Sequence, residues 1–220
     1  MSVRRITVLI SGKGSNLQAL IDAGRSGQFS ADLVHVISDR ADAAGLERAS
    51  GAGVPTSILE AGGFTGRGPY DQALANLVAE HSPDLVILAG FMRIVGPATV
   101  QRFGSRMINL HPSLLPLYRG TDTYRRAIEA RDKEHGSSMH FVTAELDGGP
   151  VISQVRIPIV DNDTPVSLAA RLAPREHGLV VGTTELFCRC SVQSRYGTVT
   201  VDGDTLQRPL QLRHDGTFET

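Results

Sequence analysis

The chain has 220 residues and a mass of 23.6 kDa, which is long enough to bury a core without disulfides or a structural metal. Hydrophobic residues make up 41% and charged residues 20%, a mix that excludes a disordered or fibrous chain. Lys and Arg number 22 against 23 Asp and Glu, which gives a net charge of −1. Because no basic excess is available to neutralise phosphates, we expect no nucleic-acid partner.

The two cysteines, Cys188 and Cys190, lie one residue apart. This spacing suits neither a disulfide framework nor a paired zinc motif, so reduced thiols are expected. We see no secretory signal and no run of roughly 18 apolar residues that could span a membrane. The expectation is a cytoplasmic protein without membrane contact.

Short β-rich runs alternate with helical stretches in the first half of the chain, the pattern of a parallel sheet covered by helices. Strands are expected at Ile6–Ile10, Leu33–Ile37, Thr56–Leu59, Leu85–Ala89 and Met107–Leu110. Helices are expected at Ser15–Ala23, Ala41–Ala52, Tyr70–His81 and Pro97–Phe103. The predicted fold class is α/β, with a mainly parallel central sheet and helices on both faces.

After Leu110 the pattern changes and favours an antiparallel edge toward the C-terminal part. The expected elements are a helix at about Asp122–Ala130, strands at Ser138–Val142 and Val151–Ile159, and a hairpin at Gly197–Leu206. A long helix is expected from Thr164, capped by Asp163 or Thr164 with Pro165 first, and kinked or restarted at Pro174. Because no repeat or linker interrupts the chain, we expect one domain.

The first expected strand runs into Ser11-Gly12-Lys13-Gly14-Ser15-Asn16, a glycine-rich turn that opens a helix. Such a turn points free N–H groups and the positive helix end at one place, which suits a phosphate, although it can also serve only as a connection. Gln18 and Ala19 stand where a dinucleotide motif has its third glycine. A monophosphate is the better fit, with Gly14 allowing close approach and Ser15 offering a hydroxyl.

Asn109 and His111 stand at the end of the fifth expected strand. Strand side chains alternate, so these two face one side and Leu110 the other. Ligands of open α/β sheets bind at the carboxyl ends of the strands, where an amide and an imidazole are offered here. The same residues can also serve structure alone, and their spacing leaves both interpretations open.

Asp147 precedes Gly148-Gly149-Pro150 and has two interpretations. Asp and Gly are common turn residues for local reasons. Alternatively, Asp147 supplies the carboxylate that orients or charges His111. Spacing does not choose between them.

Together these features resemble the folate-dependent formyltransferases. The matching segments, in family order, are ISGKGSNLQALID, ADAAGLERA, DLVILAGFMRIV, INLHPSLLP and HGSSMHFVTAELDGGPVI. With the sequence between them they cover about residues 5 to 160. The resemblance implies a single Rossmann-like formyltransferase domain over residues 1–220, in which residues from about 164 to 220 depart from the family pattern.

The resemblance implies an activity in de novo purine synthesis. A formyl group would pass from 10-formyltetrahydrofolate to the primary amine of 5'-phosphoribosylglycinamide, with no metal, in a cytoplasmic monomer or homodimer. Asn109, His111 and Asp147 are implied as the catalytic set. The first two would donate to the oxygen of a tetrahedral intermediate, and Asp147 would assist proton transfer.

Two sets of binding residues are implied by the same resemblance. The substrate set is Gly14, Ser15 and Asn16 for the phosphate and Glu176 for the sugar. The folate set is Arg67, Met92, Arg93, Ile94, Val95 and Asn109.

Several positions depart from the family pattern. Leu117 stands where many relatives carry lysine, and Arg119 offers a positive charge nearby. Val180-Val181 replaces a Tyr-Pro pair that follows the glutamate, and Pro174 precedes it. How these differences act on substrate binding is left open.

Three alternatives share parts of this pattern. A methionyl-tRNA formyltransferase adds a basic C-terminal domain, for which we expect no room after Thr164. A formyltetrahydrofolate hydrolase adds an N-terminal regulatory domain, for which we expect no room before Arg5. A protein that binds folate or a nucleotide without turnover would keep the pocket alone.

Overall fold

The computed structural model describes residues 4–219 and comprises two compact units. The first unit contains the chain up to Asn109 together with Val142–Ala144, and the second contains Leu110–Phe141 and the chain from Glu145 onward.

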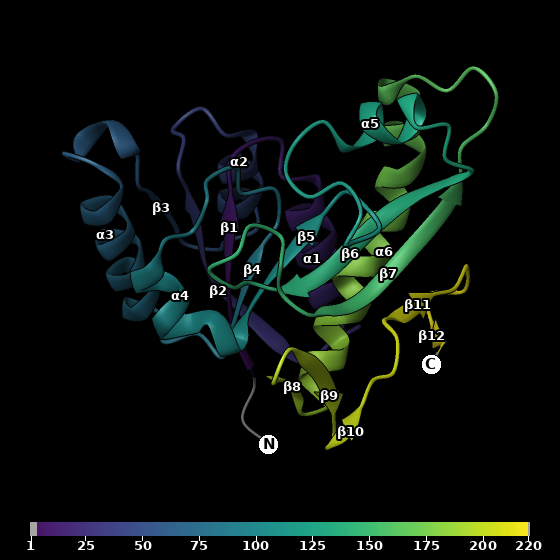
Figure 1. The fold of residues 1–220 in the computed structure, drawn as a ribbon. Coiled ribbons are helices and arrows are strands. Elements are labelled where there is room, and N and C mark those ends of the chain that lie inside the picture. The colour runs from purple at the N-terminus through teal and green to yellow at the C-terminus, as the bar shows by residue number, and fades with distance from the viewer. Residues whose placement is uncertain (1–3, 220) are drawn as a thin grey trace. The chain divides into compact units, whose positions relative to one another are not determined.

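Parallel strands form the centre of the first unit and pair in the order β5-β4-β1-β2-β3 (Figure 1). Their bounds are β1 (Arg4–Ile10), β2 (Ala31–Ser38), β3 (Thr56–Ile58), β4 (Leu85–Leu88) and β5 (Met107–His111), whose last two residues belong to the second unit. The helices between them are α1 (Ser15–Arg25), α2 (Ala44–Gly51), α3 (Arg67–Glu80) and α4 (Pro97–Phe103), with single 3-10 turns at Ala61–Gly63 and Gly104–Arg106.

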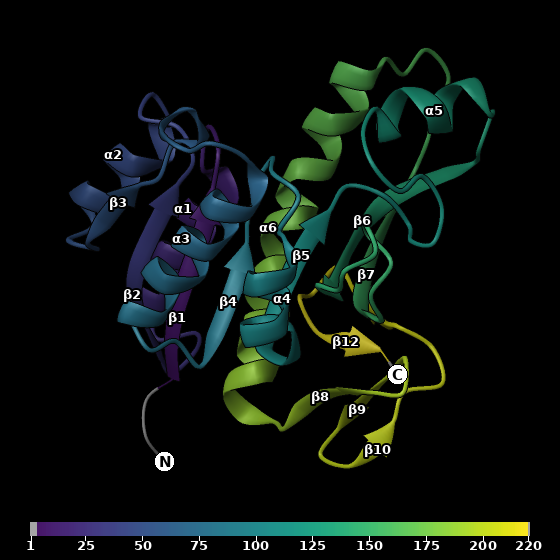
Figure 2. The same cartoon turned by 60° about the vertical axis from the view of Figure 1, so that its left-hand side comes forward.

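Helices cover both faces of the first unit's sheet (Figure 2). Leu9 of β1 lies in a core with Leu74 of α3 and Phe103 beside it. The next residue, Ile10, points the other way, since a Cβ built on Gly45 of α2 would lie 2.5 Å from Ile10 Cδ1. Successive side chains of β1 therefore pack against helices on opposite faces of the sheet. The predicted fold class is confirmed.

Strands of the second unit pair in the order β12-β11-β7-β6. β6 pairs antiparallel with β7, β11 parallel with β7, and β12 antiparallel with β11. Helix α6 packs on β6 and β7, and α5 packs on α6. The bounds are α5 (Thr123–Glu129), β6 (Glu134–Phe141), β7 (Val151–Pro158), α6 (Pro165–Arg189), β11 (Leu210–Leu212) and β12 (Phe218–Glu219). A separate antiparallel sheet contains β8 (Val192–Arg195), β9 (Thr198–Val201) and β10 (Asp204–Thr205).

The start of α6 follows from its sequence. The Thr164 side chain accepts a hydrogen bond from Ser167 N at 3.1 Å, and Ser167 Oγ accepts one from Thr164 N at 2.9 Å, with Pro165 first in the helix. The helix continues through Pro174, so the predicted restart there is wrong, while the alternative, a kink, stays a prediction. A proline removes one helical hydrogen bond, while fully buried Leu172 and Leu179 hold the turns on either side.

Several expected boundaries were also wrong. α2 begins at Ala44 and not at residue 41, and β6 begins at Glu134 and not at residue 138. The early part of β6 includes Gly136, where a Cβ would lie 1.9 Å from Val155 O. This close pairing with β7 is a long-range feature that local propensity does not report. The expectation of one domain over residues 1–220 stays a prediction.

Candidate active site

The glycine-rich turn after β1 forms a small cradle in the first unit. Gly14 precedes α1 with φ 69°, and a Cβ there would lie 2.6 Å from Gly45 Cα, so only glycine fits. Ser11 to Asn16 line a cavity of about 210 Å³ together with Ala89, Gly90 and Met92. Within residues 4–219, the buried Oδ1 of Asn16 has no hydrogen-bond partner. The three residues expected to bind phosphate thus lie in one polar hollow at a helix start.

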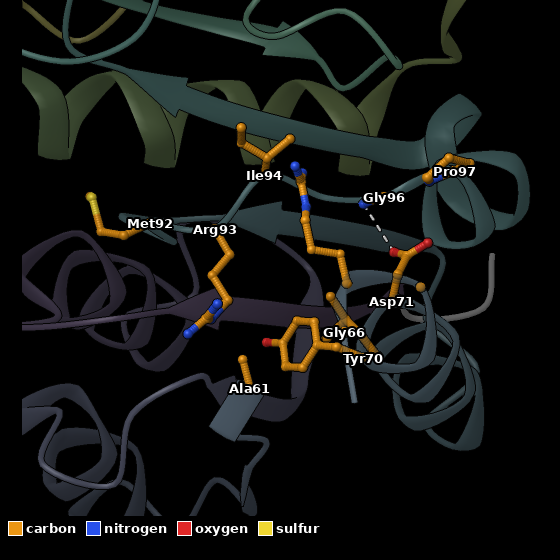
Figure 3. A pocket seen from close by; sticks show the side chains of 12 residues that line it. Ala61, Gly66, Tyr70, Asp71, Met92, Arg93, Ile94, Gly96 and Pro97 are labelled. Atoms are coloured by element: carbon orange, nitrogen blue, oxygen red, sulfur yellow. Dashed lines mark hydrogen bonds between the residues drawn. The ribbon is translucent and has the colours of Figure 1, made fainter. Parts of the chain in front are cut away.

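A second cavity of about 690 Å³ lies in the same unit (Figure 3). Of the residues expected to bind folate, Arg67, Met92, Arg93 and Ile94 line it. Met92 is 78% exposed and Ile94 54%, which leaves apolar surface open to a ligand. Val95 instead packs in the hydrophobic core.

The two cavities share Met92. Met92 N donates to Ser11 Oγ at 2.7 Å, so the segment that follows β4 is tied to the glycine-rich turn. Two ligands held in these hollows would meet at this residue.

Tyr70 and Asp71, which sequence reasoning missed, line the larger cavity, and Asp39, also missed, contacts the lining residue Arg93. Asp39 Oδ2 lies 2.8 Å from Arg93 Nε, and the Arg93 guanidinium lies over the Tyr70 ring at 5.2 Å. Burial, together with the Asp39 charge, raises the pKa of Tyr70 to about 12. Asp71 accepts hydrogen bonds from Gly96 N and from residues of α4. Asp39 could have been predicted as a site residue, because it directly follows β2 and ligands bind at the carboxyl ends of such strands.

His111 and Asp147 meet in the second unit. His111 Nδ1 lies 3.5 Å from Asp147 Oδ2, and His111 Nε2 donates to Tyr118 O at 3.0 Å. Gly120 N donates to the same Oδ2 at 2.9 Å. Asp147 also has φ 47°, as in a turn, so both interpretations of this residue describe its geometry.

Asn109 lies two residues before His111 on β5, opposite Leu88 of β4. Its backbone position belongs to the parallel sheet of the first unit. The alternation of the strand places Asn109 and His111 side chains on one side.

His140 is a further histidine beside Asp147 that sequence reasoning left without a role. Its Nε2 lies 3.7 Å from Asp147 Oδ1, and its Nδ1 is 2.9 Å from Phe141 O. Burial lowers the pKa of His140 to about 4, so this ring is neutral at pH 7. Of the two rings, His111 lies closer to the Asp147 carboxylate.

The segment between β5 and α5 is held by charged and aromatic contacts. Arg119 pairs with Glu145, Tyr118 OH donates to Asp132 at 2.6 Å, and Arg126 lies over the Tyr118 ring at 5.2 Å. The positive charge of Arg119 is thus paired internally. These contacts fix the carbonyl that faces His111.

Glu176 lies on α6 and is partly buried. Its Oε1 accepts from Ser137 Oγ at 2.5 Å and from Tyr124 OH at 3.4 Å. Burial raises the pKa of this carboxyl, and the two hydroxyl donors act in the opposite direction. Glu176 is placed in a polar cluster of the second unit.

Within residues 4–219, no group of three or more His, Cys, Asp or Glu residues has metal-binding geometry. No helix in that part of the chain combines the length and apolarity that crossing a membrane requires.

An α/β fold with a glycine-rich turn at a helix start and a large cavity in the same unit is typical of proteins that bind phosphate-bearing small molecules. Residues 4–184 match the family model described as formyl transferase, and the chain belongs to this family. The expected resemblance is thereby confirmed.

Individual relatives refine this assignment. The chain is 45% identical over 201 residues to the phosphoribosylglycinamide formyltransferase of Escherichia coli, which covers 91% of this chain and 95% of the relative. It is 40% identical to the human trifunctional purine biosynthetic protein adenosine-3 over 86% of this chain and 19% of that protein. The structure of a phosphoribosylglycinamide formyltransferase from Coxiella burnetii superimposes with a TM-score of 0.88 at 42% identity, covering 93% of this chain and 96% of that one.

Proposed function

We propose that the chain transfers the formyl group of 10-formyltetrahydrofolate to the amine of 5'-phosphoribosylglycinamide, a step of de novo purine synthesis. The observation that carries the proposal is the contact of His111 Nδ1 with Asp147 Oδ2 at 3.5 Å, in a chain whose relatives are named for this activity. An imidazole beside a carboxylate suits acyl transfer to an amine, which needs hydrogen-bond donors and a proton path.

The reaction forms a bond from the amine nitrogen to the formyl carbon and breaks the bond from that carbon to the folate nitrogen. Attack by the amine creates a tetrahedral intermediate with an oxyanion and a cationic nitrogen. One proton leaves the attacking nitrogen and one proton reaches the departing folate nitrogen, so the exchange needs a proton path and no metal.

His111 and Asn109 act on the oxyanion. The His111 ring lies between Tyr118 O, 3.0 Å from Nε2, and Asp147 Oδ2, 3.5 Å from Nδ1. The Nε2–H group turns from Tyr118 O to the oxyanion, and the Asn109 amide supplies a second donor. Each such donor contributes about 3 kcal/mol of transition-state stabilisation.

Asp147 stabilises the imidazolium and assists proton transfer. Its Oδ2 is fixed by Gly120 N–H, and neutral His140 leaves its charge to His111. Loss of the carboxylate removes the counter-charge without removing the ring.

Binding is divided between the polar hollow and the larger cavity. Gly14, Ser15 and Asn16 hold the substrate phosphate, and Glu176 holds the sugar. The cavity of about 690 Å³ lies within the range of small-molecule sites and accepts the folate along Met92 to Val95, with Arg67, Arg93 and Asn109. Because both hollows share Met92, the two substrates are adjacent. The proposal takes the chain as one cytoplasmic formyltransferase domain that acts as a monomer or homodimer.

The test is a spectrophotometric formyl-transfer assay with 10-formyl-5,8-dideazafolate as donor. The expected result is turnover that requires 5'-phosphoribosylglycinamide and is absent with glycine or with water alone. Loss of donor in water alone would instead indicate a hydrolase. Binding of both ligands without product would indicate a protein that has lost turnover.

A further inference from the structure

Residues 41–49, ADAAGLERA, are one of the segments that resemble the family, and the proposed reaction gives them no role. They include the start of α2, which packs on α1 and reaches the glycine-rich turn. Gly45 N donates to Gly12 O at 3.0 Å, and Arg48 Nε donates to Lys13 O at 2.9 Å. Helix α2 therefore holds two consecutive carbonyl groups of the turn.

The amide groups of the same two peptides point the other way. In a planar trans peptide the N–H group is directed opposite to the C=O group, so Lys13 N–H and Gly14 N–H point away from α2. Among residues 4–219, neither of these N–H groups donates a hydrogen bond. Successive free amides of this kind form a concave site for an anion.

Arg48 contacts the turn without lining the polar hollow. Its Nη1 donates to Gln18 Oε1 at 3.3 Å, and a Cβ built on Gly14 would lie 3.5 Å from Arg48 Cδ, so the side chain lies against the turn. The hollow is lined by residues 11–16 and by residues that follow β4, and by no described residue of α2. Arg48 therefore acts on a ligand in the hollow only through the turn or through its charge.

We propose that Arg48 is a positioning residue for the phosphate of the substrate. Its Nε–H group fixes Lys13 O and thereby directs Gly14 N–H into the polar hollow. The inference rests on the proposed function, in which Gly14, Ser15 and Asn16 hold this phosphate. The hydrogen bond performs this role, and the charge adds little because Arg48 is exposed to water and salt that screen it.

Three substitutions of Arg48 separate the hydrogen bond from the charge. Glutamine carries an N–H group on Cδ, the atom that carries Nε in arginine, and it has no charge. Lysine keeps the charge but has a carbon at this position, and methionine keeps neither the charge nor the donor. The readouts are KM for 5'-phosphoribosylglycinamide, KM for 10-formyl-5,8-dideazafolate, and kcat.

The expected result is a separation of KM from kcat. Arg48→Met and Arg48→Lys should raise KM for the ribonucleotide roughly 10-fold, the effect of one lost charge-assisted hydrogen bond to the phosphate. Arg48→Gln should stay within about threefold of wild type, because it keeps the donor to Lys13 O. KM for the folate donor and kcat should stay within about twofold in all three variants.

Arg25→Met is the matched control, because Arg25 is an exposed arginine at the last residue of α1. It removes the same charge from the same unit and should leave KM for the ribonucleotide within about twofold of wild type.

A substrate without the phosphate gives a second readout. For the dephosphorylated ribonucleoside, kcat/KM of Arg48→Met should lie within about twofold of wild type, because Gly14 N–H then has no phosphate to bind. A purely structural effect of the substitution would reduce kcat/KM equally for both substrates.

Three results would overturn the inference. One is an Arg48→Met protein whose KM for the ribonucleotide lies within about twofold of wild type. Another is a wild-type KM in Arg48→Lys with a raised KM in Arg48→Gln, which would assign the effect to charge. The third is an equal loss for the phosphorylated and the dephosphorylated substrate.

Calorimetric binding of 5'-phosphoribosylglycinamide separates this inference from the proposed function. Affinities that are higher in wild type and Arg48→Gln than in Arg48→Lys and Arg48→Met, in a protein without turnover, would retain the inference and reject the activity. Turnover with affinities that do not depend on Arg48 would do the reverse. Absence of both binding and turnover would reject both.

Discussion

Replacing Asp71 with alanine should destabilise the first unit, because this side chain caps a helix other than its own. Helix α4 has no cap from Gly96, and Asp71 of α3 accepts from Gly96 N and Ala98 N in place of one. Asp71 is 5% exposed, so both amides would lose a buried acceptor. The Thr99 hydroxyl keeps an alternative acceptor, Asp71 O at 3.1 Å.

The cost follows from these contacts. Loss of an N-cap costs about 1 kcal/mol, and a buried amide left without an acceptor adds about 1 kcal/mol or more. A total of about 2 kcal/mol lowers Tm by roughly 4–8 °C in a chain of this length.

Thermal unfolding followed by circular dichroism measures the effect. Asp71→Asn keeps one acceptor oxygen and should lie between wild type and Asp71→Ala. Asp32→Ala is the control, because Asp32 is an exposed residue of β2, and its Tm should stay close to wild type. An Asp71→Ala protein that unfolds within 2 °C of wild type would refute the reasoning, taking roughly 4 °C as the smallest expected shift.

Three further outcomes are expected. Gly14→Ala should raise KM for 5'-phosphoribosylglycinamide at least roughly 10-fold, because the added Cβ would collide with Gly45 Cα. Gly27 also has a positive φ, 75°, but open space around it, so Gly27→Ala should affect stability alone. Equal KM values in the two variants would contradict this. Burial and the neighbouring His81 lower the pKa of His35 to about 4, below its value in the unfolded chain, so stability is lost as pH falls from about 6.5 toward 4. Urea unfolding of His35→Gln should show a weaker dependence over that window, and an unchanged dependence would reject the assignment. Burial raises the pKa of Glu176, because the charged carboxylate is unfavourable in the fold. Glu176→Gln should therefore keep Tm at or above the wild-type value at pH 8, and it should raise KM for the ribonucleotide. A clear fall in Tm would show that the charge itself stabilises the fold.

Several regular elements could be predicted because short stretches of sequence determine them. Residues Pro97–Phe103 were assigned to a helix with the observed bounds, and Thr164 with Pro165 marked the start of α6. Local periodicity and capping chemistry decide such elements. Gly14 was informative for the same reason, since a strand, a glycine and a helix follow in sequence.

Contacts across long stretches of chain were not predictable. Asp39 and Arg93 are brought together by the order of the parallel strands, and Asp71 caps a helix 25 residues away. The early start of β6 depends on the approach of Gly136 to Val155. In each case tertiary packing determines which residues are in contact, and the local sequence pattern does not predict it.

The same distinction applies to the candidate site. The alternation of side chains along a strand predicted that Asn109 and His111 face one side. The contact of His111 with Asp147 depends instead on how the chain between them folds, which no local pattern reports. His140 gave no sequence signal beyond its place on a strand, and its neutrality comes from burial.

Loss of the His111 side chain tests whether this residue performs formyl transfer with Asp147 as its partner. The measurement is the single-turnover rate of formyl transfer to 5'-phosphoribosylglycinamide by wild type and by His111→Ala, with both ligands saturating and their affinities measured separately. The expected result is a rate reduced roughly 10²-fold to 10⁴-fold, with affinities within about threefold of wild type. Transfer of the formyl group at the wild-type rate by His111→Ala would exclude this role.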